Sequence, residues 1–272
     1  MNNNEAPPEP IADADPGLAG WDDPLASLRR ALDRDELQIY CQPILSLQGT
    51  GEKYPMAEVL VRLREEEESL LPPGDFLPVF EHYRMMTDLD CWVIQKTVEW
   101  LAEARPGSIR SYAVNVSSQS LDDARLPDFA ARALKRCGVE PAQLCVEIDE
   151  VDTLQRAQSA EQFARLMRKV GCKVIIDGFA RRSVSFSALK SLQPEYVKVD
   201  GAVVRKISSS PVAQLKLKAI ARVCAVAGIG IIAECVEEQA IVAQLTEMSI
   251  GYAQGFGIAV PQPISVGGFP PA

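Results

Sequence analysis

The sequence has little of what zinc sites and disulfide frameworks are built from. It holds one histidine, His82, and seven cysteines that are scattered without a Cys-x-x-Cys pair. Structural zinc sites need cysteine and histidine ligands at short spacings, and small secreted domains usually carry an even set of cysteines. The pattern therefore predicts free thiols in a reducing compartment, and with them a cytoplasmic protein.

Long apolar runs and an excess of positive charge are also missing. No run reaches the ~18–20 apolar residues that a bilayer span needs, and residues 1–17 lack the basic start and apolar centre of a signal peptide. The formal net charge is −9, which repels a phosphate backbone and argues against binding to nucleic acid. A local basic pocket for a small anionic ligand stays compatible with this charge.

The chain divides into a tail and one predicted domain. Residues 1–20 are rich in Asn, Pro, Asp and Ala, so they are expected to be disordered. Residues 21–272 alternate between β-rich runs and helical patterns, and two of the helical patterns, 154–171 and 211–228, end at glycine as a C-cap prefers. The β-rich runs are residues 37–47, 54–63, 111–118, 143–150, 172–179, 195–200, 229–236 and 252–260.

This order predicts an α/β fold, a (β/α)8 TIM-like barrel with one antiparallel strand. Only the short segment QGTGEK joins the first two β-runs, so that pair is predicted to form an antiparallel hairpin. The other runs leave room for a helix between them over about 250 residues, which is typical of a barrel. The alternative, an open doubly wound sheet, usually carries a Gly-rich phosphate loop after its first strand, and none is present.

Seven of the β-runs carry one polar group late in their length. Because the C-terminal ends of barrel strands converge on one face, these groups are predicted to meet over a single mouth. Carboxylates buried together need a cation, and oxygen ligands without His or Cys suit Mg²⁺ or Mn²⁺. One such acid alone is more often a helix N-cap or ion-pair partner, but seven at matching positions predict a site. They are Glu58, Asn115, Glu147, Asp177, Lys198, Glu234 and Gln254.

The order of these motifs resembles the EAL-domain family, bacterial proteins that bind cyclic di-GMP and, when active, hydrolyse it to linear pGpG. The resemblance covers about residues 25–265, and AEVLVR stands where the family's E-A-L-x-R signature belongs. It implies the EAL type of barrel. The motifs that carry it are YCQPILSL, AEVLVR, LDCWVIQKT, YAVNVSSQSL, VEIDE, IIDGF, YVKVD, IAECVEE and AQGFGIAVPQP.

The resemblance implies roles for the strand-end groups in metal and water chemistry. Lys198 matches the lysine that contacts the catalytic water, and Glu58 and Glu234 join it as catalytic residues. Glu150 matches a glutamate that braces the loop after the fifth parallel β-run. The implied ligands of a first Mg²⁺ or Mn²⁺ ion are Glu58, Asn115, Glu147 and Asp177.

The resemblance also implies a nucleotide pocket. Arg62 is expected to pair with phosphate through its forked donors, and Phe256 to stack on a guanine. Asp90 and Gln42 are placed to read guanine edges, although Asp90 equally fits an early helical acid favoured by the helix dipole. The implied ligand-binding set, with Leu60 and Pro261 contributing backbone, is Gln42, Leu60, Arg62, Asp90, Gln254, Phe256 and Pro261.

One motif departs from the family. Active members carry two adjacent aspartates followed by Phe-Gly-Thr-Gly, and the second aspartate serves a second metal ion. This chain reads DGFARRS, so Gly178 stands in place of that aspartate. Arg181 and Arg182 replace small loop residues, and they either meet ligand phosphates or face solvent. Cys235 also replaces a glycine of the family. The first metal set is therefore predicted to be intact and the second incomplete.

Three functions remain after this comparison. The leading hypothesis is a degenerate EAL domain that acts as a cyclic di-GMP receptor, with little or no hydrolysis, and signals to a protein partner. Whether such a receptor needs a metal stays open. The alternatives are an active Mg²⁺- or Mn²⁺-dependent phosphodiesterase that gives pGpG, and a scaffold that acts through protein contacts without nucleotide. The resemblance also implies a homodimer.

Overall fold

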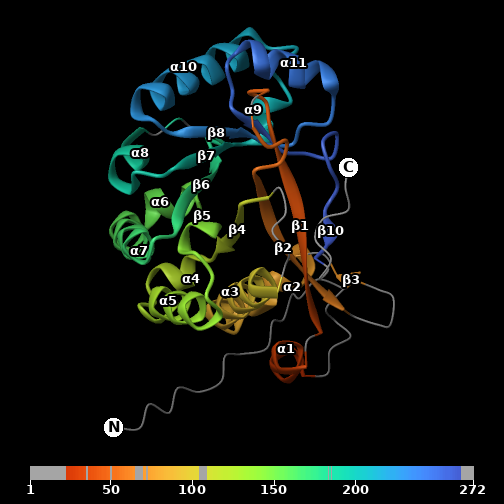
Figure 1. Ribbon diagram of the computed structural model, residues 1–272, viewed down its shortest axis with the longest axis vertical. Coiled ribbons are helices and arrows are strands. Elements are labelled where there is room, and N and C mark those ends of the chain that lie inside the picture. Colours follow the sequence, from red (N-terminus) through yellow and green to blue (C-terminus); the bar gives the residue numbers. More distant parts are fainter. Residues whose placement is uncertain are drawn as a thin grey trace.

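The computed structural model describes residues 23–264 except 35, 50, 65–69, 72, 104–108, 183 and 185. The predicted tail, residues 1–20, lies outside the described residues. The strands of the described part form one sheet in the order β10-β1-β9-β8-β7-β6-β5-β4-β2-β3, which an additional pairing of β1 with β2 closes into a barrel. Figure 1 shows helices on the outer side of the strands from β4 to β8, as expected for a barrel.

The eight β-rich runs of the sequence all contain strands. Two very short strands, β3 and β10, were not predicted. The main strands are β1 (Leu37–Ser46), β2 (Met56–Arg64), β4 (Ser111–Val116), β5 (Leu144–Asp149), β6 (Lys173–Phe179), β7 (Tyr196–Val199), β8 (Gly230–Ala233) and β9 (Tyr252–Ala253), and the short ones are β3 (Leu70–Leu71) and β10 (Gln262–Pro263).

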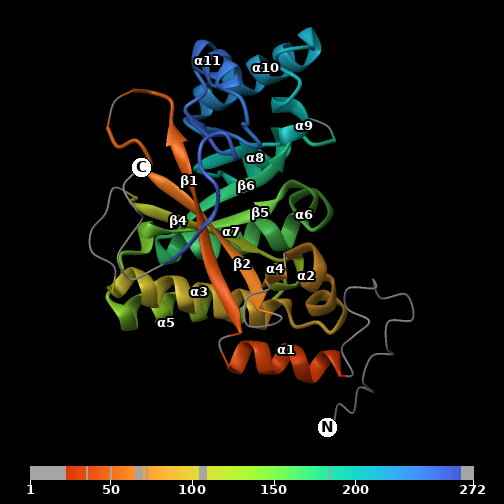
Figure 2. The ribbon, with the colours of Figure 1, turned by 90° about the vertical axis from the view of Figure 1, so that its right-hand side faces the viewer.

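The first strand is the reversed one. β1 runs antiparallel to β2, with Gln42 opposite Glu58, and antiparallel to β9, with Leu45 opposite Ala253. The pairs from β2–β4 through β8–β9 are parallel. The predicted antiparallel hairpin is therefore confirmed. Figure 2 shows it as a long ribbon on one side of the barrel, with α1 near one end.

The helices follow the strands on the outside of the barrel. The predicted glycine C-caps are present, because Gly171 and Gly228 adopt left-handed conformations with φ of 105° and 71° after α7 and α10. The helical elements are α1 (Pro24–Asp33), α2 (Pro73–His82), α3 (Met86–Glu103), α4 (Ser118–Leu121), α5 (Arg125–Cys137), η1 (Pro141–Gln143), α6 (Glu150–Gln155), α7 (Ala157–Val170), α8 (Phe186–Leu192), α9 (Gly201–Val204), α10 (Pro211–Ala227) and α11 (Gln239–Glu247).

The last β-run, residues 252–260, is mostly not a strand. Only its first two residues pair in the sheet, and the chain then turns, with Ile258 N donating to Gly255 O at 3.0 Å. The cause is close packing, because a Cβ on Gly255 would stand 2.2 Å from the carbonyl oxygen of Val236. The backbone here leaves the sheet and crosses over the segment after β8.

Two apolar layers hold the barrel together. One lies between the sheet and the helices and contains most of the buried residues, among them Phe76, Phe163 and Phe179. The other fills the barrel interior. None of the helices within the described ranges combines the length and the apolar character that a membrane crossing requires. The interior residues are Ile44, Met56, Ala113, Cys145, Ile175 and Ile232, with Tyr196 and Tyr252 packed against them.

Candidate ligand site at the barrel mouth

The interior layer explains how the mouth is assembled. Side chains alternate between the two faces of a strand, so a residue two positions beyond an inward-facing one also faces inward. In or directly after each of the seven parallel strands, a polar residue lies two positions beyond an apolar interior residue and thus one layer higher. The pairs are Met56 and Glu58, Ala113 and Asn115, Cys145 and Glu147, Ile175 and Asp177, Tyr196 and Lys198, Ile232 and Glu234, and Tyr252 and Gln254.

The Lys198 ammonium lies at the centre of this upper layer. Its Nζ is 2.8 Å from Glu58 Oε2 and 2.9 Å from Glu147 Oε2. It is also 3.4 Å from Asp177 Oδ1 and 3.3 Å from Glu234 Oε1, and the lysine side chain is only 1% exposed. One cation therefore faces four carboxyl groups. The sequence analysis predicted this gathering, and the structure brings all five residues together.

Burial and neighbouring charges shift the pKa values of three of these acids in different directions. Burial raises the pKa of Glu147 well above its usual value, against the opposing effect of Lys198. Burial also raises the pKa of Glu234 to about 8. Burial works against ionisation of Asp177 as well, but Lys198 and a hydrogen bond with Glu234 outweigh it and lower the pKa of Asp177. The Glu234 carboxyl therefore holds a proton more readily than Asp177, with which it shares a hydrogen bond.

Two amides complete the ring around Glu58. Asn115 Nδ2 donates to Glu58 Oε1 at 2.8 Å, and Gln254 Nε2 donates to Glu58 Oε2 at 2.7 Å. Gln254 also lies 3.2 Å from Gln42 Oε1, and Gln42 Nε2 donates to the carbonyl of Ala259 at 2.9 Å. Gln42 therefore connects the first strand to the segment that follows β9. The guanine contact predicted for Gln42 stays a prediction.

The oxygen-rich set offers several donor atoms of the kind that one divalent ion binds. As the carboxylates stand, they close on Lys198, and no group of three or more His, Cys, Asp or Glu among the described residues is arranged to hold a metal ion. Glu147 Oε1 and Gln254 Oε1 nevertheless lack a hydrogen-bond partner, and Asp177 Oδ1 has only the ion pair with Lys198 at 3.4 Å. Buried carboxylate oxygens without a hydrogen bond, together with an amide, suit a hard cation. The donor atoms of the implied first metal site therefore fit Mg²⁺ or Mn²⁺.

The position of the expected second aspartate does not fit a metal ion. Gly178 has a φ of +63°, and a Cβ there would stand 2.4 Å from Arg181 Nη2. The guanidinium thus fills the space where an aspartate side chain would begin. Arg181 Nε donates to Asp200 Oδ2 at 2.7 Å, and Nη1 donates to Asp149 Oδ2 at 3.1 Å. Chiefly the hydrogen bond to Asp200 raises the pKa of Arg181, so this cation is permanent.

Glu150, the first residue of α6 after β5, reaches the loop that follows β6. Its Oε2 accepts a hydrogen bond from the backbone N–H of Ala180 at 3.0 Å, directly after β6. Lys216 Nζ on α10 donates to the carbonyl of Ala180, and Ala180 has a left-handed φ of 69°. The backbone N–H and C=O of the buried Ala180 are therefore both held by side chains, the N–H by Glu150 of α6 and the C=O by Lys216 of α10.

The residues expected to contact phosphate and guanine lie around the mouth. Arg62 is on the inward face of β2, four positions beyond Glu58, with its guanidinium carbon 5.7 Å from the centre of the Tyr40 ring. Phe256 is 68% exposed, which is unusual for a phenylalanine. It is held between Gly255 and Gly257, whose missing side chains allow close packing. Leu60 and Pro261 are half-buried.

Asp90 lies near the start of α3, as the early helical acid that the sequence allowed, and its contact with guanine stays a prediction. It is buried in α3, and its Oδ2 accepts hydrogen bonds from Ser117 N at 2.9 Å, Ser117 Oγ at 2.7 Å and Ser120 Oγ at 2.7 Å. Burial raises its pKa to about 6, although the serines oppose the shift. Here the carboxyl joins α3 to the start of α4, a contact that the sequence analysis missed because Ser117 and Ser120 are distant in the chain.

Asp149 and Asp200 were also missed. Each follows an inward polar residue by two positions, Glu147 and Lys198 respectively, and each caps a helix: Asp149 Oδ1 accepts from Val151 N at 2.7 Å, and Asp200 Oδ1 accepts from Ala202 N at 2.8 Å. An acid placed directly before a helix was the available signal. What it did not reveal is the second oxygen of each carboxylate, which binds Arg181.

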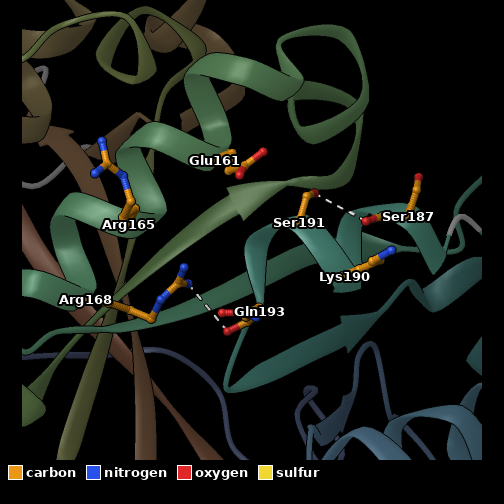
Figure 3. Close-up of a pocket in the computed structure, with 7 residues that line it drawn as sticks. All are labelled: Glu161, Arg165, Arg168, Ser187, Lys190, Ser191 and Gln193. Atoms are coloured by element: carbon orange, nitrogen blue, oxygen red, sulfur yellow. Dashed lines mark hydrogen bonds between the residues drawn. The ribbon is translucent and has the colours of Figure 1, made fainter.

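A surface cavity lies apart from the mouth. It has a volume of about 450 Å³ and is lined by residues of α7 and α8 and the turn after α8 (Figure 3). Arg168 points to the end of α8, where its Nη1 donates to the carbonyls of Leu192 and Gln193. No predicted site residue lines this cavity. The lining residues are Glu161, Arg165, Arg168, Ser187, Lys190, Ser191 and Gln193.

Comparisons with known proteins agree with this architecture. The EAL domain model matches residues 25–261. Cyclic di-GMP phosphodiesterase PdeB of Shewanella oneidensis is 31% identical over 239 residues, covering 88% of this chain and 28% of the relative. Cyclic di-GMP phosphodiesterase PdeF of Escherichia coli is 30% identical over 241 residues, covering 87% and 31%. The chain thus spans about a third of the length of these curated relatives.

Solved structures give the same result. The FimX EAL domain from Pseudomonas aeruginosa bound to c-di-GMP superposes with a TM-score of 0.82 at 28% identity, covering 88% of this chain and 96% of that one. The PaMucR phosphodiesterase in complex with c-di-GMP has a TM-score of 0.80 at 26% identity, covering 88% and 97%. With the barrel, the strand-end ring and these matches in agreement, the chain belongs to the EAL domain family.

Proposed function

We propose that this chain is a receptor for cyclic di-GMP that binds the nucleotide with little or no hydrolysis and passes its occupancy to a protein partner. The similarities support the ligand. Curated relatives are named cyclic di-GMP phosphodiesterases, and two similar structures are complexes with c-di-GMP. The local geometry supports the receptor role.

The observation that carries the receptor role is the loss of a carboxylate beside Asp177. The Gly178 side chain offers no ligand atom, and Arg181 Nη2 stands 2.4 Å from the place that a Cβ would take. Two-metal hydrolysis needs one ion on the attacking oxygen and one on the leaving oxygen. A fixed guanidinium repels a second divalent ion, so the transition state loses stabilisation, and each ~1.4 kcal/mol lost slows the reaction tenfold.

Ground-state binding uses residues that do not depend on position 178. Arg62 would hold a phosphate with its forked donors. The exposed ring of Phe256 offers an apolar face on which a guanine would stack. Gln42 would present its amide to a base edge, and the backbone at Leu60 and Pro261 would line the pocket. The chain therefore keeps the means of recognition while losing part of the means of turnover.

A second function, Mg²⁺- or Mn²⁺-dependent hydrolysis to pGpG, is favoured by buried oxygens of Glu147 and Asp177 that accept no hydrogen bond. A bound divalent ion would lower the pKa of a water and so supply the nucleophile. Lys198 would neutralise the charge that develops on the phosphate, and Glu234 would hold a proton beside Asp177. The residues that would hold the ion are Glu58, Asn115, Glu147 and Asp177.

Calorimetric titration of cyclic di-GMP into the protein in Mg²⁺ buffer, followed by chromatography of the recovered nucleotide, separates these functions. Saturable heat with intact nucleotide supports the receptor. Continuing heat with pGpG appearing supports the phosphodiesterase and contradicts the disabling role given to Gly178. A flat trace refutes both and leaves a scaffold that works through protein contacts.

Arg62→Ala tests whether the heat arises in the proposed pocket. Loss of one charge-assisted pair with phosphate is expected to weaken binding about tenfold or more. The matched control is Arg29→Ala, which removes an exposed arginine of α1 and is expected to leave binding unchanged. Equal binding by both variants would place the nucleotide elsewhere on the molecule.

A further inference from the structure

The loop after β6 places one arginine over the mouth. Arg181 N donates to Gly178 O at 3.2 Å, which closes a four-residue turn. The left-handed φ values of Gly178 and Ala180, 63° and 69°, let the chain fold back on itself at this point. The turn brings the Arg181 side chain back toward Gly178. The guanidinium therefore lies beside Gly178, the residue directly after Asp177.

Two acids from neighbouring strand ends hold the guanidinium in this place. Asp149 ends β5 and Asp200 follows β7, so they approach from opposite sides of β6. Asp200 binds Nε of Arg181 at 2.7 Å, and Asp149 binds Nη1 at 3.1 Å. The third nitrogen, Nη2, is the atom nearest to Gly178. The side chain is 44% exposed, so a bound molecule can reach it.

The geometry points to Arg181 as a built-in cation that replaces a second divalent ion and contacts a phosphate oxygen of the bound cyclic dinucleotide. With Nε and Nη1 bound to the two acids, Nη2 keeps N–H donors for a phosphate oxygen, and holding the guanidinium between two carboxylates removes much of the ordering cost of binding. Binding by this chain then needs no second metal ion. The inference rests on the proposed function and names one more residue of the same pocket.

A purely structural role is the competing explanation. Arg181 could fasten the loop after β6 to its neighbours and have no contact with ligand. The two roles differ in one measurable quantity. A fastening residue affects the stability of the loop, whereas a phosphate-contacting residue changes the dissociation constant for the nucleotide in the absence of divalent ions.

The experiment is calorimetric titration of cyclic di-GMP into the full chain, in EDTA and in Mg²⁺ buffer, for the wild type and three variants. Arg181→Ala removes the cation, and Arg181→Lys keeps the charge without the fork. Arg182→Ala is the matched control, because Arg182 is the adjacent exposed arginine and pairs with no acid among the described residues. Circular dichroism and thermal unfolding report whether each variant is folded.

The expected result is binding by the wild type in EDTA that is weakened roughly ten- to a hundredfold by Arg181→Ala and less by Arg181→Lys. Arg182→Ala should bind like the wild type. Binding that requires Mg²⁺ in the wild type would overturn the inference without any variant. Equal affinity of the wild type and Arg181→Ala would also overturn it and leave the receptor standing. No binding under either condition would instead refute the proposed function itself.

Discussion

Removal of the central ammonium is the sharpest perturbation of this site. Lys198→Met keeps the length of the side chain but leaves the surrounding acids without their cation. Glu58 and Glu147 lose a partner at 2.8 and 2.9 Å, and Glu147 is almost completely buried. Removing one member of a buried ion pair costs about 3–5 kcal/mol. Because single domains are stable by about 5–15 kcal/mol, much of the free energy of unfolding should be lost.

The loss should depend on pH in a known direction. Without Lys198, the remaining carboxyls of the folded state bind protons more tightly than those of the unfolded chain. The folded state then holds more protons near neutrality, so its stability falls as the pH rises. One extra proton changes the free energy of unfolding by about 1.4 kcal/mol per pH unit. The variant should therefore be closer to the wild type at pH 5.5 than at pH 7.5.

Urea unfolding followed by tryptophan fluorescence measures this difference. The matched control is Lys190→Met, an exposed lysine on α8, which should change stability by less than about 0.5 kcal/mol. Mg²⁺ should stabilise Lys198→Met more than the wild type, by up to about 2.7 kcal/mol at a hundred times its dissociation constant. A loss below about 1 kcal/mol at pH 7.5, or a loss independent of pH, would refute the described balance of charges.

Three further variants test other parts of the structure. In the wild type, the raised pKa of Asp90, about 6, should lower the free energy of unfolding by about 3 kcal/mol as the pH rises from about 4 to 6. Asp90→Asn should remove this decline, and parallel pH profiles of the two proteins in urea unfolding would contradict the burial of this carboxyl. Gly178→Asp should lower the melting temperature, because its φ is +63° and its Cβ would meet Arg181. Adding Arg181→Ala should recover part of that loss, and no recovery would show that backbone strain alone is responsible. Gly255→Ala should lower the free energy of unfolding more than Gly138→Ala, because a Cβ at Gly255 would meet the Val236 backbone at 2.2 Å and one at Gly138 would meet nothing within 4 Å. Equal unfolding midpoints of the two variants would contradict the close packing at Gly255.

The strand-end ring was predictable from local pattern. A polar residue two positions after an inward apolar one is visible in the sequence for each strand from Met56 and Glu58 onward. Parallel strands then bring these residues to one end whatever the details of the loops. The barrel and its hairpin followed from the same alternation and from the short connection between the first two strands.

The environment of Arg181 was not predictable in the same way. Its position depends on a turn with two left-handed residues, of which Ala180 is not one that sequence rules favour there. It depends also on Asp149 and Asp200, which come together only after three strands have paired in register. The surroundings of Asp90 likewise arise from contacts between α3 and the segment after β4. Contacts between residues distant in the chain determine the surroundings of Arg181 and Asp90. Local sequence patterns therefore did not predict them.

The reversed first strand has a consequence for how the protein is made. Gln42, near the start of the described chain, bonds to Ala259 and Gln254, more than 200 positions later. During synthesis, β1 leaves the ribosome long before β9 and β10 exist to flank it. The nascent chain must therefore carry an open sheet edge, and such distant pairings form slowly. The mouth becomes whole only with the final segment, so a prematurely terminated chain would present an exposed edge and an unfinished pocket.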